Sequence, residues 1–302
     1  MKIPFCLTLT LCSSLLALNS FAATPPYSET FEGYATGNTA VTNFTEISTG
    51  AWTIVSPSIS GKGYEDAISA FSSGTGFANG VGSSSGISFP ALSSSSFALS
   101  TLFRIDSLTL TGSDVANTAA IGLFARGADD TPASSSSDRY QVAYILDDDG
   151  SGHPTGRLWL REVNVFFGDS LNILSATSLP ITLGNVYQMT LSGTDSGGSV
   201  LFSATLTDTT TSSSISVSKT DASNLLTGSN FGYLNSVYVE DGGTTALNVD
   251  FDNFSMVPEP GTAILLLFGL GIHVTTRVCV AGNVKRRARG HREDRSSSCE
   301  LC

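Results

Sequence analysis

The chain has 302 residues and a formal net charge of −11, and only 14% of its residues are charged. Most of the acidic residues lie between Ala23 and Met256. This region has 22 acidic and 7 basic residues, so its net charge is about −15. An acidic surface with scattered basic residues repels phosphate backbones, so we expect no nucleic-acid binding. All five cysteines lie outside this region, which excludes disulfides and thiolate metal sites from it.

The first 22 residues have the organisation of a secretory signal peptide. Lys2 is followed by an apolar run through Leu18, and Ser20-Phe21-Ala22 places small residues where signal peptidase reads them. We therefore expect a signal helix over residues 1–22 that is cleaved after Ala22. An uncleaved membrane anchor is the alternative, although the apolar run is shorter than the roughly 20 residues that a span needs.

Residues 23–256 have the pattern of one all-β ectodomain. Apolar residues alternate with period two in seven segments, each of which can bury one face of a strand: Phe97–Ile105, Ala120–Arg126, Tyr140–Leu146, Arg157–Val163, Val186–Leu191, Val200–Leu206 and Ala246–Phe254. Further strands are expected near Thr30 and Trp52, and at Ser214–Ser218 and Tyr233–Val239. The Ser/Gly-rich segments Ser72–Gly86 and Ser93–Ser96 are interpreted as loops.

Turns rich in Asp and Gly separate these segments and predict antiparallel hairpins. About ten or eleven strands are too many for one open sheet of this size, so we predict an antiparallel β-sandwich of two packed sheets. The arrangement resembles the concanavalin A-like jelly rolls of lectins, laminin-G-like modules and carbohydrate-binding modules.

Two short motifs could indicate a nucleophilic serine, but neither has a supporting base. Gly82–Gly86 matches a G-x-S-x-G pattern, and Asp195–Gly198 resembles a serine-protease nucleophile loop. The ectodomain contains one histidine, His153, in a Gly/Pro loop without a supporting motif. The paired-carboxylate pattern Glu-x-Asp-x-x-Glu of jelly-roll glucanases is absent. We therefore expect a protein that is not an enzyme, with a secreted glycan-active hydrolase as the alternative.

Acidic residues suggest two possible calcium sites. Asp147, Asp149 and Ser151 offer alternating oxygens but no closing glutamate, so a solvated hairpin tip is the preferred interpretation. The second candidate joins the two ends of the domain, where Glu29–Gly33 and Asp250–Phe254 resemble the ends of carbohydrate-binding modules that hold a structural calcium. That resemblance implies Glu32 and Asp252 as the ligands; ordinary exposed carboxylates are the alternative.

A ligand-binding surface is expected around Trp159. In an alternating strand Trp159 lies between Arg157 and Arg161, on the face opposite Leu158 and Leu160. An aromatic ring with flanking guanidinium groups can stack on a sugar and donate to its hydroxyls. A half-buried structural tryptophan is the alternative.

The C-terminal region has a proline motif, an apolar run and a basic end. Val257-Pro258-Glu259-Pro260 precedes the run Ala263–Ile272, which is followed by Arg277. Basic residues after a short hydrophobic helix are typical of a tail held with its end in the cytoplasm. The order resembles the PEP-CTERM sorting signal of Gram-negative bacteria, which implies an exosortase-type membrane protease as partner.

Under that resemblance Pro258, Glu259 and Pro260 are the recognition motif, residues 257–277 are the sorting and transmembrane segment, and Arg277 starts the basic cluster. The chain departs from the family pattern by continuing for 25 residues after Arg277, including Lys285–Arg289. Either this later cluster stops the segment, or residues 278–302 are an abnormal extension, which we expect to be basic and disordered.

These features together predict an exported cell-envelope or extracellular-matrix protein. The C-terminal helix would anchor it transiently in the inner membrane before it reaches the cell surface or the medium. The β-sandwich is expected to bind, or to be embedded in, extracellular polysaccharide, as in the biofilm context of the PEP-CTERM family. A structural surface protein with no glycan ligand is a further alternative.

Overall fold

The computed structural model describes residues 25–48, 52–92, 95–111, 117–128, 138–147, 155–163 and 171–258. The chain divides into two compact units, Met1–Pro258 and Glu259–Cys302, and every described residue belongs to the first. The predicted signal helix and the predicted C-terminal hydrophobic helix lie outside the described residues. Within the described ranges, no helix has the length and apolar character needed to cross a membrane.

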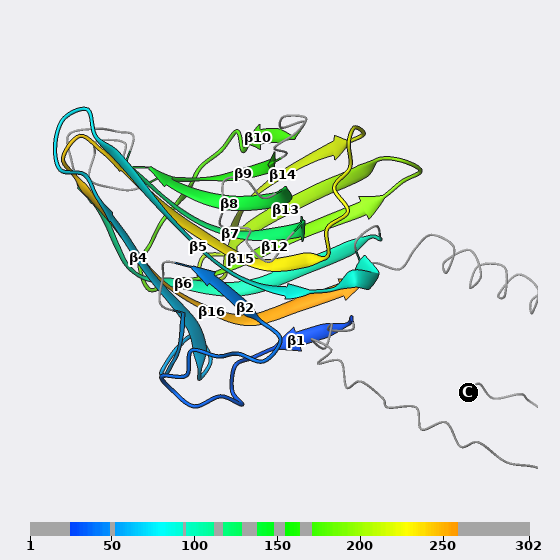
Figure 1. Ribbon diagram of the computed structural model, residues 1–302, viewed down its shortest axis with the longest axis horizontal. Helices are drawn as coiled ribbons and strands as arrows, with labels where there is room; N and C mark the ends of the chain where they lie inside the picture. The colour runs from blue at the N-terminus through cyan, green and yellow to red at the C-terminus, as the bar shows by residue number, and fades with distance from the viewer. Residues whose placement is uncertain are drawn as a thin grey trace, which may run out of the picture. The chain divides into compact units, whose positions relative to one another are not determined.

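The first sheet, sheet A, has eight strands (Figure 1). Their order is β14 (Ser213–Asp221), β13 (Val200–Asp208), β12 (Val186–Asp195), β6 (Phe97–Thr111), β16 (Thr244–Pro258), β4 (Gly63–Phe71) and β3 (Thr53–Val55), with β1 (Tyr27–Glu29) also paired to β16. All of these pairings are antiparallel.

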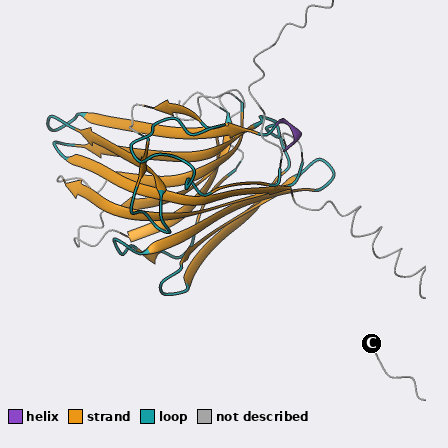
Figure 2. Cartoon of the chain, turned by 90° about the horizontal axis from the view of Figure 1, so that it is seen from below, coloured by secondary structure: helices purple, strands orange, loops and turns teal. Residues whose placement is uncertain are grey.

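The second sheet, sheet B, also has eight strands. Their order is β10 (Asn172–Leu174), β9 (Thr155–Val163), β8 (Arg139–Asp147), β7 (Thr118–Gly127), β15 (Asn230–Glu240), β5 (Ala78–Ser88) and β2 (Thr45–Ser48), with β11 (Leu179–Pro180) also paired to β9. A short 3-10 helix, Pro90–Leu92, is the single helical element among the described residues, and Figure 2 shows strands and loops almost throughout. The predicted all-β antiparallel sandwich is confirmed.

The core lies between the two sheets and is rich in aromatic rings. Trp52, Tyr64, Tyr233 and Phe251 are almost completely buried and pack on one another. The ring centroids of Trp52 and Tyr64 lie 4.8 Å apart, and those of Tyr233 and Phe251 lie 4.4 Å apart. Strand alternation delivers these side chains to one interior, because residues two apart on a strand share a face.

Each segment that the alternation pattern marked as a strand is a strand, but sixteen strands occur in the described ranges rather than ten or eleven. The interpretation of Ser72–Gly86 as a loop is wrong from Ala78 onward, where β5 begins. Ser83, Ser84 and Ser85 are fully buried in β5.

Two of these serines are small side chains that form hydrogen bonds with aromatic residues of the core. The Trp52 Nε1 donates to the Ser83 Oγ at 2.6 Å, and the Tyr64 hydroxyl lies 3.2 Å from the Ser85 Oγ. The small polar residues of β5 are buried because large side chains from other segments, Trp52 and Tyr64, pack against them.

Candidate functional site

The outer face of β16 carries two buried aspartates. Leu247, Val249 and Phe251 point into the core, as predicted, which leaves Asp250 and Asp252 on the opposite face. Both carboxylates are nevertheless buried, with 1% and 0% of each residue exposed. Glu32, the other predicted ligand, is exposed.

A turn between β3 and β4 covers these two aspartates. The Ser58 Oγ donates to the Asp250 Oδ2 at 3.0 Å, and the Ser60 Oγ donates to the Asp252 Oδ2. Gly63 permits this approach, because a Cβ at that position would lie 2.0 Å from the Ser58 Oγ. The turn thus removes both carboxylates from solvent while giving each of them one hydroxyl donor.

Glu32 reaches the same turn, so the structure brings the two predicted calcium ligands to one place. The Lys62 backbone N–H donates to the Glu32 Oε1 at 2.8 Å. Burial raises the pKa of Asp252 above its usual range, the hydrogen bond from Ser60 opposes this rise, and the nearby Glu32 charge adds to it. The Glu32 charge is thus close enough to disfavour the ionised form of Asp252.

Gly61 and Lys62 pack closely against Glu32. Gly61 has a φ of +144°, and a Cβ on it would lie 2.2 Å from the Glu32 Oε1. The Lys62 ammonium donates to the carbonyl oxygens of Glu32 at 3.1 Å and of Tyr34 at 2.5 Å. The Lys62 ammonium thus already occupies these two carbonyl oxygens, which leaves the carboxylates of Glu32 and Asp252 as the candidate calcium ligands.

A second carboxylate group on sheet A was missed by sequence reasoning. Glu65, Asp106 and Asp250 each offer one oxygen, and these oxygens lie within 4.8 Å of one another. Glu65 belongs to β4, which the alternation pattern did not reveal. No sequence signal placed it beside Asp106.

Trp159 lies on the outer face of sheet B with its two arginines, as predicted. Leu158 and Leu160 are fully buried beneath it. The Arg161 Cζ lies 5.0 Å from the centroid of the Trp159 ring, and the Trp159 Nε1 donates to the Asn172 Oδ1 at 2.7 Å. Both contacts hold the half-buried indole in a fixed orientation.

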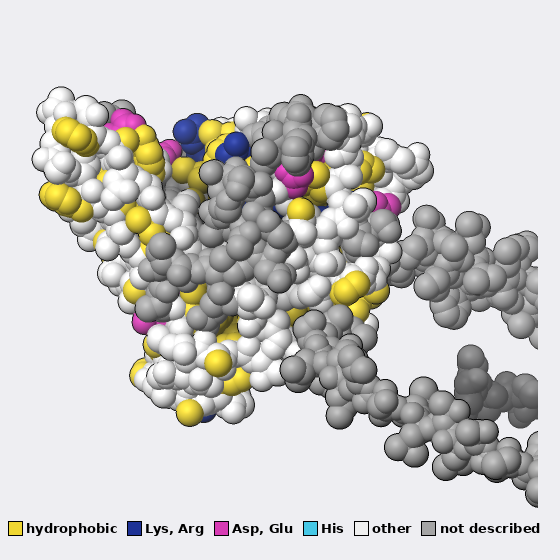
Figure 3. All heavy atoms as spheres, viewed as in Figure 1, with side chains coloured by type: hydrophobic (Ala, Val, Ile, Leu, Met, Phe, Trp, Pro, Cys, Tyr) yellow, Lys and Arg dark blue, Asp and Glu magenta, His cyan; other side chains and the backbone are white. Residues whose placement is uncertain are grey.

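Arg157 completes this row and keeps 47% of its side chain exposed, with its Nη2 3.6 Å from the Asp147 Oδ2. In Figure 3 basic side chains lie beside hydrophobic ones in the region where Figure 1 labels β9. An aromatic ring and two guanidinium groups therefore form one outward-facing row. Of the first predicted calcium loop, the structure describes only Asp147, the last residue of β8, and burial raises the pKa of its carboxyl. Asp149 and Ser151 lie outside the described residues.

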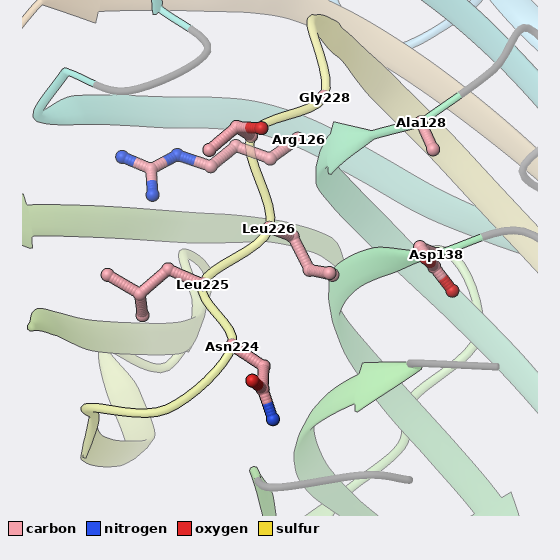
Figure 4. Close-up of a pocket in the computed structure, with 8 residues that line it drawn as sticks. Arg126, Ala128, Asp138, Asn224, Leu225, Leu226 and Gly228 are labelled. Carbon is pink, nitrogen blue, oxygen red and sulfur yellow. The ribbon is translucent and has the colours of Figure 1, made fainter. Parts of the chain in front are cut away.

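A pocket of about 490 Å³ lies at the ends of β7 and β8 (Figure 4). It is lined by Arg126, Ala128, Asp138 and the segment 224–228. Arg126 is 1% exposed and sits at a β-bulge with a φ of +52°. Its Nη2 donates to both carboxylate oxygens of Asp195, at 3.1 and 2.9 Å, which ties sheet B to sheet A.

Neither serine motif forms a catalytic arrangement in the described structure. Ser83 to Ser85 lie buried in the middle of β5 rather than on an exposed strand-to-helix turn. Asp195 is engaged by Arg126, and the Ser196 backbone N–H donates to the Ser199 carbonyl in the β12–β13 turn. The described ranges include no histidine, and His153 falls outside them.

The predicted sorting segment begins inside the last strand. β16 extends through Val257 to Pro258, where Pro258 lies opposite Phe97 of β6. Glu259, Pro260, the apolar run, Arg277 and residues 278–302 lie outside the described residues.

A family model described as the PEP-CTERM protein-sorting motif matches residues 257–289. The C-terminal region carries a PEP-CTERM sorting motif. The match extends past Arg277 and includes the basic cluster Lys285–Arg289, so that cluster is part of the matched motif rather than of an unrelated extension. Such a motif indicates an exported protein with a membrane-anchoring tail.

No curated protein sequence matches the chain. Similar solved structures include lectin I from Ulex europaeus, at 13% identity over 76% of this chain and 98% of that one, with a TM-score of 0.43. The basic winged bean lectin has 10% identity over 78% of this chain and 99% of that one, with a TM-score of 0.42.

Proposed function

We propose that the protein is an exosortase-sorted envelope or matrix protein whose β-sandwich binds extracellular polysaccharide without catalysing a reaction. The sorting motif supports export and processing. The row of Arg157, Trp159 and Arg161 carries the binding part of the proposal. An indole offers an apolar plane to the C–H face of a sugar, and guanidinium groups donate several hydrogen bonds to hydroxyl or carboxylate oxygens.

The geometry favours this use because the indole is already held in place. Its N–H is bonded to Asn172, and Arg161 lies over its ring. A rigid aromatic group loses little conformational entropy when a ligand binds, so more of the contact energy appears as affinity. Arg157 remains exposed enough to reach a sugar bound beside the ring.

Replacing Trp159 by alanine is expected to weaken polysaccharide binding about tenfold, the effect of losing roughly 1.4 kcal/mol of stacking and packing. Leu201→Ala is the matched control, because Leu201 is an exposed apolar side chain on β13 of sheet A. Binding to arrayed glycans and to extracted extracellular polysaccharide measures the effect. Unchanged binding by Trp159→Ala, or release of reducing sugar by the wild type, contradicts the proposal.

We also propose that Glu32 and Asp252 hold a structural calcium ion that fastens the N-terminal segment to β16. A cation that binds the folded state alone stabilises it by about 2.7 kcal/mol at a hundredfold excess over Kd, or roughly 5–10 °C in a domain of this size. Millimolar calcium should therefore raise the melting temperature, and Asp252→Asn should abolish most of the rise.

Asp241→Asn is the matched control for that experiment, since Asp241 lies in the β15–β16 turn and its carboxylate accepts from the Gly76 N–H. This variant should keep the full calcium response. A wild type whose melting temperature ignores calcium would rule the site out.

A further inference from the structure

Three carboxylates and one guanidinium form a row across the outer face of sheet A. In the register of the sheet, Asp250 of β16 lies opposite Glu65 of β4 on one side and Arg104 of β6 on the other. Side chains directly opposite on neighbouring strands have Cβ atoms about 5 Å apart, so this row is in contact.

Asp106 enters the row through a β-bulge. Ile105 pairs with Val249 and Ser107 pairs with Asn248, so Asp106 is the extra residue on β6. A bulge changes the direction of the side chain it carries. Here it brings the Asp106 carboxylate into contact with the Arg104 guanidinium. One oxygen from each of Glu65, Asp106 and Asp250 then lies within 4.8 Å of the other two.

Arg104 offsets only part of this negative charge. Its Nε donates to the Asp106 Oδ1 at 2.6 Å, its Nη2 donates to the Asp250 Oδ2 at 2.7 Å, and its Nη1 donates to the Ser58 carbonyl at 3.2 Å. The guanidinium therefore bonds two of the three carboxylates, while Glu65 accepts from the Asn248 Nδ2. Burial, followed by the Asp106 charge, raises the pKa of Asp250 to about 6, with a further contribution from Glu65 that Arg104 and Ser58 only partly oppose.

Two buried oxygens in this row have no hydrogen-bond donor, which is a second observation besides the excess negative charge. Asp250 is 1% exposed, and its Oδ2 accepts from Ser58 and Arg104 while its buried Oδ1 accepts no hydrogen bond. The buried Oδ1 of Asn248, the neighbouring residue on that face of β16, also lacks a donor, although its Nδ2 donates to the Glu65 Oε2 at 3.1 Å. A buried acceptor without a donor destabilises the fold, and more strongly when it is charged.

We propose that Glu65, Asp106 and Asp250, with the amide oxygen of Asn248, bind a divalent cation of the calcium class, at a second site separate from Glu32 and Asp252. All of the donors are hard oxygens, which select calcium or magnesium rather than zinc or copper. A divalent ion balances the charge, because three carboxylates and one guanidinium leave two negative charges. The ion would supply a partner for the Asp250 Oδ1.

The two sites share β16 but no ligand. Asp252 belongs to the next row of the sheet, opposite Leu102 of β6, and its carboxylate accepts from Ser60 rather than Ser58. The second site would fasten β4, β16 and the β6 bulge together. Its existence is independent of glycan binding, and loss of one calcium site does not imply loss of the other.

Calcium binding to the full-length chain, titrated with calcium chloride by calorimetry, tests the proposal. The wild type should bind two ions, and the double variant Glu65→Gln, Asp106→Asn should bind one or bind the second at least tenfold more weakly. Both replaced side chains are partly exposed, so the fold should be kept. Asp252→Asn should remove the other ion, and Asp241→Asn should leave both.

Replacing Arg104 changes calcium affinity if these carboxylates bind calcium, and would not change it if they serve only to stabilise the sheet. Arg104→Gln removes the competing positive charge, so the melting temperature without calcium should fall while the second site binds calcium more tightly. The proposal is overturned by a wild type that binds no calcium, or by one whose calcium stoichiometry and affinities are unchanged in the Glu65, Asp106 and Arg104 variants.

Discussion

Replacing Trp52 by alanine is expected to lower the free energy of unfolding by about 3–5 kcal/mol. The indole is completely buried, its centroid lies 4.8 Å from that of Tyr64, and its ring stacks on Tyr233 and Phe251 at 5.8 Å. Alanine would leave a cavity between the sheets. It would also leave the buried Ser83 hydroxyl without its present donor, which adds to the cost of the lost packing.

Urea unfolding followed by circular dichroism measures this loss without relying on tryptophan fluorescence. Trp159→Ala is the matched control, because it makes the same exchange at a half-buried position on the outer face of sheet B, where surface substitutions usually cost less than about 1 kcal/mol. The loss of unfolding free energy in Trp52→Phe should lie between those of Trp52→Ala and Trp159→Ala, because phenylalanine keeps an aromatic ring. Equal losses for Trp52→Ala and Trp159→Ala would show that Trp52 does not organise the core.

The strands that the sequence predicted are those whose inward positions are uniformly apolar. In β13 the inward residues Val200, Phe202, Ala204 and Leu206 are all buried, and the period-two pattern is sufficient to identify the strand. β4 interrupts its pattern with the buried Asp66, whose Oδ2 accepts from Asn235 of β15 at 2.8 Å. That partner is distant in sequence, so local pattern reasoning could not explain the aspartate and missed the strand.

The same limit applies to the candidate sites. Alternation alone placed Asp250 and Asp252 on the outer face and put Trp159 opposite Leu158. It could not predict that the aspartates are buried, because their hydroxyl partners Ser58 and Ser60 lie 192 residues earlier in the chain. Asp106 depends on a bulge, a one-residue shift in pairing that is decided by both strands together.

Replacing Glu259 together with Pro258 and Pro260 is expected to keep the full-length protein in the inner membrane, instead of releasing a shortened form. The apolar run Ala263–Ile272 has ten residues, about 15 Å of helix, whereas a bilayer core is roughly 30 Å thick. It must extend toward the basic cluster Lys285–Arg289 to span, and burying His273 and Arg277 on the way costs energy. Such a segment is a marginal anchor, suited to brief retention followed by cleavage, and without its recognition motif cleavage should fail.

Mass spectrometry of protein released by an exosortase-bearing host distinguishes sorting from plain anchoring. If processing occurs after Pro258, the released protein keeps β16 complete, including the pair of Pro258 with Phe97, so the sandwich loses no strand when its anchor is removed. Glu293→Gln and Asp294→Asn lie beyond the matched residues and should be released like the wild type. Peptides from Asn283 onward in the released fraction would contradict cleavage, and would leave a weak, unprocessed membrane anchor as the account of this segment.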